Sequence, residues 1–323
     1  MSLSYEYSIG SVRVKESFLF SSADRETLLA CKNTAELIAF LRDKNYGDGN
    51  TVDEIIESNT KNMWSYIKSV APDFSLFEPF ALMNDAHNLK TVLKGIMSER
   101  DYSGLLMTPC TLSEEYLKSV VEDIRLDRLP QWLADAAKGA YKILAETKDA
   151  RLSDAMIDNA LMKELLSQAK KTDSIFIREY IECLVFYSNI KTAIRAAKTN
   201  AASHYLDVAL CDMKGFDKCA MKAAALRGVD EVLNVAEKIS AYHCSEAIEK
   251  YRQSPSEFEK YVDNLYIRLA VELCRHRDEG PEPLLGYYIG CEYEHKMIYI
   301  IAGGIITGTP SDKLRERLRE NYG

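Results

Sequence analysis

A helical pattern of sixteen residues occurs three times in this chain, at residues 82–97, 183–198 and 291–306. The first two copies share the tetrapeptide Asn-(Leu/Ile)-Lys-Thr, at residues 88–91 and 189–192, a spacing of 101 residues. The third copy begins 108 residues after the second. Solenoid repeats have periods of roughly 20–50 residues, so this much longer spacing predicts the triplication of a whole helical domain.

We call these three segments the hub helices, because each carries an apolar stripe on one face. From Leu82 to Ile96, apolar residues recur in steps of four and three, which place them on the same side of an α-helix. The same steps begin at Cys183 and at Cys291. Met297 stands in the third copy where the first two carry asparagine. Three related units are therefore expected, each donating one hub helix to a shared centre.

Helical periodicity extends through most of the remaining sequence, without sustained alternation of apolar and polar residues. The 323 residues include only 15 Gly and 8 Pro, which argues against disorder and against a turn-rich all-β fold. An apolar content of 47% suffices for a buried core. We predict an all-α fold of three structurally similar helical domains, at residues 1–107, 108–210 and 211–323, related by pseudo-threefold symmetry.

The net charge of −8 is the opposite of the concentrated basic surface that nucleic-acid binding requires, so we expect no nucleic-acid partner. The eight cysteines include no Cys-x-x-Cys pair and indicate neither a zinc ribbon nor a redox pair. The first residues lack the apolar core of a signal peptide. The longest uncharged apolar-rich run, Met297–Ser311, is shorter than the about 20 residues that span a bilayer. We expect a cytosolic protein without a membrane span.

Residues typical of helix starts precede several predicted helices. The segment Ser75–Glu78 has the spacing of a capping box, and Pro79 suits the first turn of the first hub helix. The segment Thr111–Glu114 has the same spacing and is expected to begin the next helix, with Thr111 as its cap. A last, highly charged helix is predicted over residues 311–321.

Two pairs of side chains have spacings that suggest metal sites. Glu292 and His295 stand three residues apart, as in di-iron helical bundles, but such sites need a second Glu-x-x-His motif and the sequence has none. Asp85 and His87 stand two residues apart, and such residues do not face each other on a helix. A satisfied core or interface histidine is the favoured interpretation of His295. We predict no catalytic residue, no metal ligand and no cofactor.

Four polar residues of the hub helices, Asn88, Lys90, Asn189 and Lys191, allow two interpretations. They belong to the shared tetrapeptide, and Lys90 lies at the margin of the apolar stripe, where a helix normally carries solvated side chains. Their repetition in two units instead suggests that they bond a neighbouring helix end or line a central cavity. The spacing by itself leaves both interpretations open.

Four stretches resemble a known family, in order along the chain. Gly10–Ser17 reads Gly-Ser-Val-Arg-Val-Lys-Glu-Ser, Asp43–Gly47 reads Asp-Lys-Asn-Tyr-Gly, Asp85–Lys90 reads Asp-Ala-His-Asn-Leu-Lys, and Gly308–Arg319 contains Leu-Arg-Glu-Arg-Leu-Arg. Together they resemble the C subunit of the prokaryotic V-type (A/V-type) ATPase, which belongs to one family with the d subunit of the vacuolar ATPase. The third hub helix departs from the family pattern, because Met297-Ile298-Tyr299 stands where Asn-Leu-Arg is usual. No polar role is therefore carried over to that helix.

The resemblance implies a funnel-shaped, non-catalytic rotor subunit around a central cavity. Family members lie on the cytoplasmic side of the membrane proteolipid ring, as peripheral subunits, and receive the foot of the central shaft in that cavity. Their coupling links ATP hydrolysis or synthesis to H⁺ or Na⁺ transport. The implied partners are the central-shaft subunits and the rotor ring. Asn88, Lys90, Asn189, Lys191 and Arg195 are then expected to face the cavity and contact the shaft.

Two other functions remain open at this point. A stand-alone all-helical scaffold or adaptor that binds a partner helix in its central groove would contain the same kind of helices and the same concave site. Co-purification with shaft or ring subunits would distinguish it from a rotor subunit. A di-metal helical oxidase would instead contain bound iron or manganese after purification.

Overall fold

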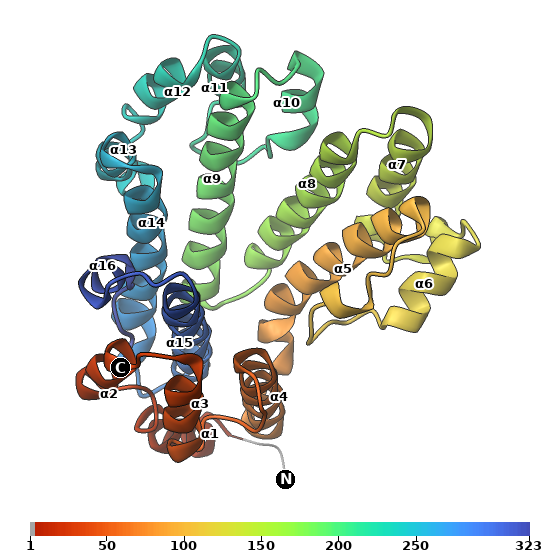
Figure 1. The fold of residues 1–323 in the computed structure, drawn as a ribbon. Coiled ribbons are helices and arrows are strands. Elements are labelled where there is room, and N and C mark those ends of the chain that lie inside the picture. The colour runs from red at the N-terminus through yellow and green to blue at the C-terminus, as the bar shows by residue number, and fades with distance from the viewer. Residues whose placement is uncertain (1–3) are drawn as a thin grey trace. The chain divides into compact units, whose positions relative to one another are not determined.

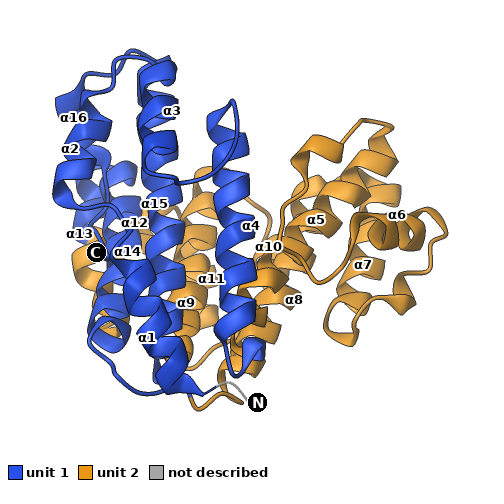
Figure 2. Cartoon of the chain, turned by 90° about the horizontal axis from the view of Figure 1, so that it is seen from below, with its two compact units in different colours: residues 1–75, 174–176, 249–323 blue, residues 76–173, 177–248 orange. Residues whose placement is uncertain are grey.

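The computed structural model describes residues 4–323, which form helices and connecting loops without a strand among them (Figure 1). The predicted all-α fold is therefore confirmed. The chain divides into two compact units (Figure 2). Unit 1 comprises the described part of residues 1–75 together with residues 174–176 and 249–323, and unit 2 comprises residues 76–173 and 177–248. The division into three similar domains around a funnel stays a prediction.

Unit 1 is built from helices at both ends of the chain. Its helices are α1 (Tyr5–Glu16), α2 (Ser22–Ala30), α3 (Thr34–Asp43), α4 (Val52–Val70), α14 (Pro255–Ala270), α15 (Glu282–Ile306) and α16 (Ser311–Arg317), with the second half of α13 (Cys244–Gln253). The third hub helix, residues 291–306, is the C-terminal part of α15. This helix begins at Glu282, well before the predicted repeat. Pro283 suits its first turn, because the N–H that proline lacks would have no partner inside the helix there.

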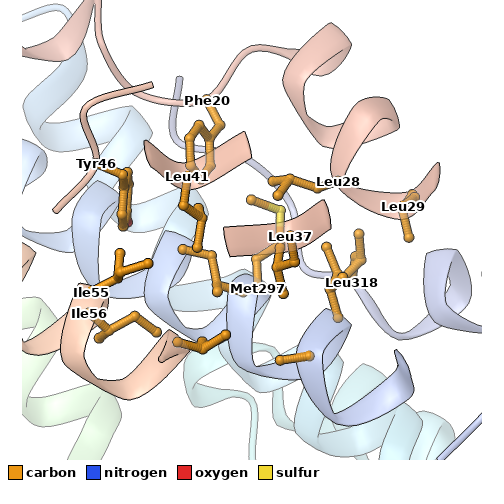
Figure 3. Packing of buried hydrophobic residues seen from close by; sticks show 14 of the residues in the cluster. Phe20, Leu28, Leu29, Leu37, Leu41, Tyr46, Ile55, Ile56, Met297 and Leu318 are labelled. Carbon is orange, nitrogen blue, oxygen red and sulfur yellow. The ribbon is translucent and has the colours of Figure 1, made fainter. Parts of the chain in front are cut away.

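The core of unit 1 combines side chains of α2, α3, α4, α15 and α16 (Figure 3). Met297 and Ile298 of α15 belong to it, and both are at most 5% exposed. Leu37 and Leu41 of α3, in the same cluster, are fully buried. Burial of such a side chain stabilises the fold by about 1.5–3 kcal/mol. The methionine at the third hub position therefore serves packing in unit 1.

Unit 2 contains the other two hub helices. Its helices are α5 (Glu78–Ser98), α6 (Glu114–Glu122), α7 (Gln131–Thr147), α8 (Ala150–Ala169), α10 (Ser203–Ala209), α11 (Lys218–Ala225) and α12 (Val229–Ala236), with most of α9 (Ile175–Lys198). The predicted stripes of α5 and α9 are buried, except that Ile96 is partly exposed. The rings of Phe80 on α5 and Tyr180 on α9 pack edge to face, with centroids 5.8 Å apart.

The start of α5 differs from its prediction. Residues 74–77 form a 3₁₀ turn, and α5 begins at Glu78 without a side-chain cap. The hydroxyl of Ser75 donates to Asp73 at 2.6 Å, so the predicted capping box does not form. Pro79 lies in the first turn, as predicted, because its missing N–H would have no partner inside the helix at this position.

The last helix, α16, is shorter than the predicted range of residues 311–321. Leu318 has extended backbone angles and is 1% exposed, so it leaves the helix to enter the core of unit 1. Arg319 then donates to Asp263 of α14 at 2.8 Å. Both contacts join residues distant in sequence, and local helical periodicity contains no information about them.

Candidate partner-binding site

The first shared asparagine, Asn88, fastens a loop to α5. Its side chain is 3% exposed. The Nδ2 group donates to the carbonyl oxygen of Met107 at 2.9 Å, and the N–H of Met107 donates to Oδ1 at 2.7 Å. A buried polar group without its partner costs about 1–3 kcal/mol. The amide therefore satisfies both backbone groups of one loop residue and fixes that residue beside the helix.

Asp85 lies one turn before Asn88 and binds the same loop further along. It is fully buried, and its Oδ1 accepts the N–H groups of Thr111 at 2.8 Å and Leu112 at 3.0 Å. Its Oδ2 accepts the hydroxyl of Thr111. The prediction that Thr111 caps α6 is wrong, because this contact uses its hydroxyl. Ser113 caps α6 instead by accepting the N–H of Tyr116.

Two more side chains complete this attachment. Asn84 donates through Nδ2 to the carbonyl oxygen of Pro109 at 2.7 Å, and Nε2 of His87 lies 2.9 Å from the carbonyl oxygen of Leu105. We call residues 105–112, which four neighbouring side chains of α5 hold, the 105–112 loop. Asp85 and His87 thus bind different parts of the loop.

The second shared asparagine repeats the arrangement of the first. Asn189 of α9 is 2% exposed, its Nδ2 donates to the carbonyl oxygen of Cys211 at 2.8 Å, and the N–H of Cys211 donates to Oδ1 at 2.8 Å. Both asparagines therefore bond the main chain of a segment that follows their own helix. The third hub helix carries Met297 at this position, whose side chain has no amide to do so.

The lysine of the first shared tetrapeptide bonds a neighbouring helix. Lys90 lies 2.5 Å from Asp158 of α8, and one turn later Lys94 lies 2.9 Å from Asp154 of the same helix. The side chain of Lys90 is 20% exposed. Of the two interpretations of Lys90, bonding a neighbouring helix is the one that the geometry supports.

The other two predicted cations lie on α9, four residues apart. Lys191 is half-buried and Arg195 is exposed. Together with the lysine of α5 and the two asparagines, they all belong to unit 2. The structure describes no partner, so contact of these five residues with a shaft stays a prediction. The burial of the two asparagine amides favours an indirect role for them.

Asp85 is a residue whose role the sequence interpretation missed, because spacing suggested only a metal pair with His87. The available signal was its position three residues before Asn88, since residues three apart lie on the same helix face. A polar pair on a largely apolar helix indicates bonding to another segment more strongly than either residue alone.

The Glu292–His295 pair of α15 also has a structural explanation. His295 is 6% exposed, and its Nε2 lies 2.8 Å from Oδ1 of Asn59. Burial lowers the pKa of His295 to about 4, so the ring is neutral near pH 7. Oε1 of Glu292 is 3.8 Å from Nδ1. The prediction of a satisfied core histidine is confirmed.

A neighbouring carboxyl, Glu294, is buried in the same helix and accepts the N–H of Phe20. Burial raises the pKa of Glu294 to about 8, although the N–H of Phe20 acts in the opposite direction.

Among residues 4–323 there is no group of three or more His, Cys, Asp or Glu side chains that could hold a metal ion. Within the same range, no helix has the length and apolar character needed to cross a bilayer.

Comparison with known proteins gives a family match over almost the whole chain. The family described as "ATP synthase (C/AC39) subunit" matches residues 8–317. The chain is 24% identical to the C subunit of the A-type ATP synthase of Methanobrevibacter smithii, over 95% of this chain and 86% of that protein. It is 21% identical to the corresponding protein of Halorubrum lacusprofundi, over 97% of both. The chain is also 28% identical to the C subunit of the V-type ATP synthase of Thermus thermophilus, over 35% of this chain and 36% of that protein.

Proposed function

This chain belongs to the ATP synthase (C/AC39) subunit family, and we propose that it is a non-catalytic rotor subunit that couples the central shaft of an A/V-type ATP synthase to the membrane proteolipid ring. In this role it would transmit rotation between ATP hydrolysis or synthesis and H⁺ or Na⁺ transport. It would lie on the cytoplasmic face of the membrane as a peripheral subunit. A socket for the shaft needs a stiff body and a large contact, not a nucleophile or a metal.

One observation carries this proposal. The family match over residues 8–317 includes most of unit 1 and all of unit 2, so it does not depend on a single motif. Two relatives, both C subunits of A-type ATP synthases, match over at least 95% of this chain. A stand-alone adaptor remains the alternative function, but no feature of the structure favours it over the rotor role.

Within this role, the hub residues divide into two groups. Asn88, Asn189 and Lys90 would act indirectly, because their polar groups already hold loops or a neighbouring helix of the protein itself. Direct contact with the shaft is proposed for Arg195, which is exposed, and for Lys191, which lies four residues earlier on the same face of α9. Torque would then be distributed over many contacts.

The test begins with cells that lack this chain. ATP hydrolysis by the catalytic head is expected to continue, while ATP-driven ion pumping by membrane vesicles is lost and returns when the purified chain is added back. An affinity-tagged chain should also retain shaft and ring subunits. A chain that retains neither, and whose deletion leaves pumping unchanged, would show that the rotor assignment is wrong.

The direct contacts need a separate comparison. Replacement of both cations, Lys191→Ala and Arg195→Ala, should weaken shaft binding, whereas Lys142→Ala should not, because that exposed lysine lies on α7. Unchanged shaft affinity in the double variant would remove these two residues from the interface. The rotor role itself would not be affected by that result, because the deletion experiment tests it separately.

A further inference from the structure

The 105–112 loop exposes apolar side chains although its backbone is firmly held. Leu105 is 64% exposed and Met107 is 49% exposed. The backbone of both residues is bonded to α5, through His87 and Asn88. Their exposure is thus a property of a fixed loop that runs back along α5 (Figure 1). A rigid apolar surface loses little conformational entropy when it binds a partner.

The second asparagine, Asn189, shows that exposure of the loop side chains does not follow from the two hydrogen bonds themselves. Around Asn189, the held segment turns its apolar residues inward: Leu210 is fully buried and Cys211 is 1% exposed. The same pair of hydrogen bonds thus accompanies buried apolar side chains in one repeat and exposed ones in the other. Leu105 and Met107 are therefore available to a partner on a loop whose backbone is already fixed.

Charges around the 105–112 loop indicate the kind of partner. Acidic side chains predominate among the exposed charged residues between positions 99 and 122, which are Glu99, Arg100, Asp101, Glu114, Glu115, Lys118 and Glu122. Tyr102 packs on Gly95 of α5 and experiences the charges of Asp101, Glu114 and Glu122 against that of Lys118. An apolar surface within an acidic surround fits a partner with apolar side chains flanked by lysine or arginine.

We infer that Leu105 and Met107 form a docking point for a basic, amphipathic helix of the central shaft. This inference rests on the proposed function for the identity of the partner, while its chemistry follows from the loop. Methionine suits such a contact, because its unbranched side chain adapts to the partner's surface. The four bonded side chains of α5 then act as the support that keeps the docking point in place.

Binding of the purified full chain to the isolated shaft subunits, measured by biolayer interferometry, tests the inference. The double variant Leu105→Ser/Met107→Ser should bind about tenfold more weakly, since loss of apolar contact of this size costs about that factor. The control Leu226→Ser, which removes an exposed apolar side chain of unit 2 far along the chain from the loop, should bind like the wild type. Wild-type affinity should fall as salt rises from about 50 mM to about 500 mM, and Glu115→Gln should reduce that dependence.

The outcomes separate the inference from the proposed function. Wild-type affinity in the double variant, when the wild type itself binds the shaft, would overturn the docking point and leave the rotor role intact. An affinity independent of salt would overturn the inference that the partner helix is basic. Failure of the wild type to bind either shaft or ring would overturn the rotor role, and the docking point with it. Unchanged thermal unfolding of the double variant would show that weaker binding does not come from misfolding.

Discussion

Asn88 and Met107 are joined by two hydrogen bonds that use both ends of one side-chain amide and both polar groups of one backbone residue. Asn189 and Cys211 form the same pair in the second hub helix. The shared asparagine of the repeat is thus explained within the chain, as the residue that fixes the segment following each hub helix. Its repetition does not require that the amides touch a partner.

The replacement Asn88→Leu should lower the stability of unit 2 by about 1–3 kcal/mol, because both backbone groups of Met107 lose their partners. Asn189→Leu should act similarly through Cys211. The chain has 2 tryptophans, and Trp132 lies in unit 2, so a Trp64→Phe background allows urea unfolding of unit 2 to be followed by fluorescence. The control Gln131→Leu removes an exposed amide. Equal stability of Asn88→Leu and this control would contradict the stabilising role of the two hydrogen bonds between Asn88 and Met107.

The pair of Lys90 and Asp158 should contribute little to stability, despite its 2.5 Å distance. Because the side chain of Asp158 is 48% exposed, water screens the attraction. A double-mutant cycle with Lys90→Met and Asp158→Asn should give a coupling free energy of about 0.2–1 kcal/mol that decreases with salt. Direct contact of Lys90 with the shaft would appear differently: Lys90→Met would weaken binding strongly, whereas Asp158→Asn would not.

Two adjacent glycines of α15 should respond in opposite directions to replacement by alanine. A Cβ on Gly304 would lie 2.2 Å from Leu314 of α16, so Gly304→Ala should destabilise unit 1 by about 1–3 kcal/mol. A Cβ on Gly303 would meet nothing within 4 Å, so Gly303→Ala should stabilise the helix by up to about 1 kcal/mol. Unfolding followed through Trp64 of unit 1, in a Trp132→Phe background, measures both. Changes of the same sign would contradict this packing.

The carboxyl of Glu294 should make unit 1 less stable as pH rises. Its pKa is raised by burial from 4.5 to about 8, so between these values the folded chain holds a proton that the unfolded chain has released. The stabilising contribution is complete below pH 4.5 and is lost toward pH 8, with a slope of at most about 1.4 kcal/mol per pH unit.

The variant Glu294→Gln removes this titration while keeping an oxygen that can accept the N–H of Phe20. Its stability relative to the wild type should therefore increase from pH 5 to pH 8. Unfolding curves at several pH values, followed through Trp64, provide the measurement. The control Glu57→Gln changes an exposed carboxyl of α4 and should run parallel to the wild type. A parallel curve for Glu294→Gln as well would mean that this carboxyl is not buried as described.

The sequence determined the all-α fold and the position of the hub helices, because apolar spacing along a helix is a local property. The stripe beginning at Cys183 is buried in α9, as that spacing requires. Resemblance along the chain also led to the family that the comparison with known proteins confirms. Helix ends were less predictable: Leu318 leaves α16 to fill the core of unit 1, which depends on residues distant in sequence.

Only the tertiary structure decided what the polar hub residues do. Contact of Asn88 and Asn189 with the shaft stays a prediction. Within the chain, their amides bond segments about twenty residues further along, and no periodicity encodes such a pairing. Asp85 acquires its partners in the same way. Spacing tells which face of a helix a side chain occupies, but the loop that returns to that face is set by the whole fold.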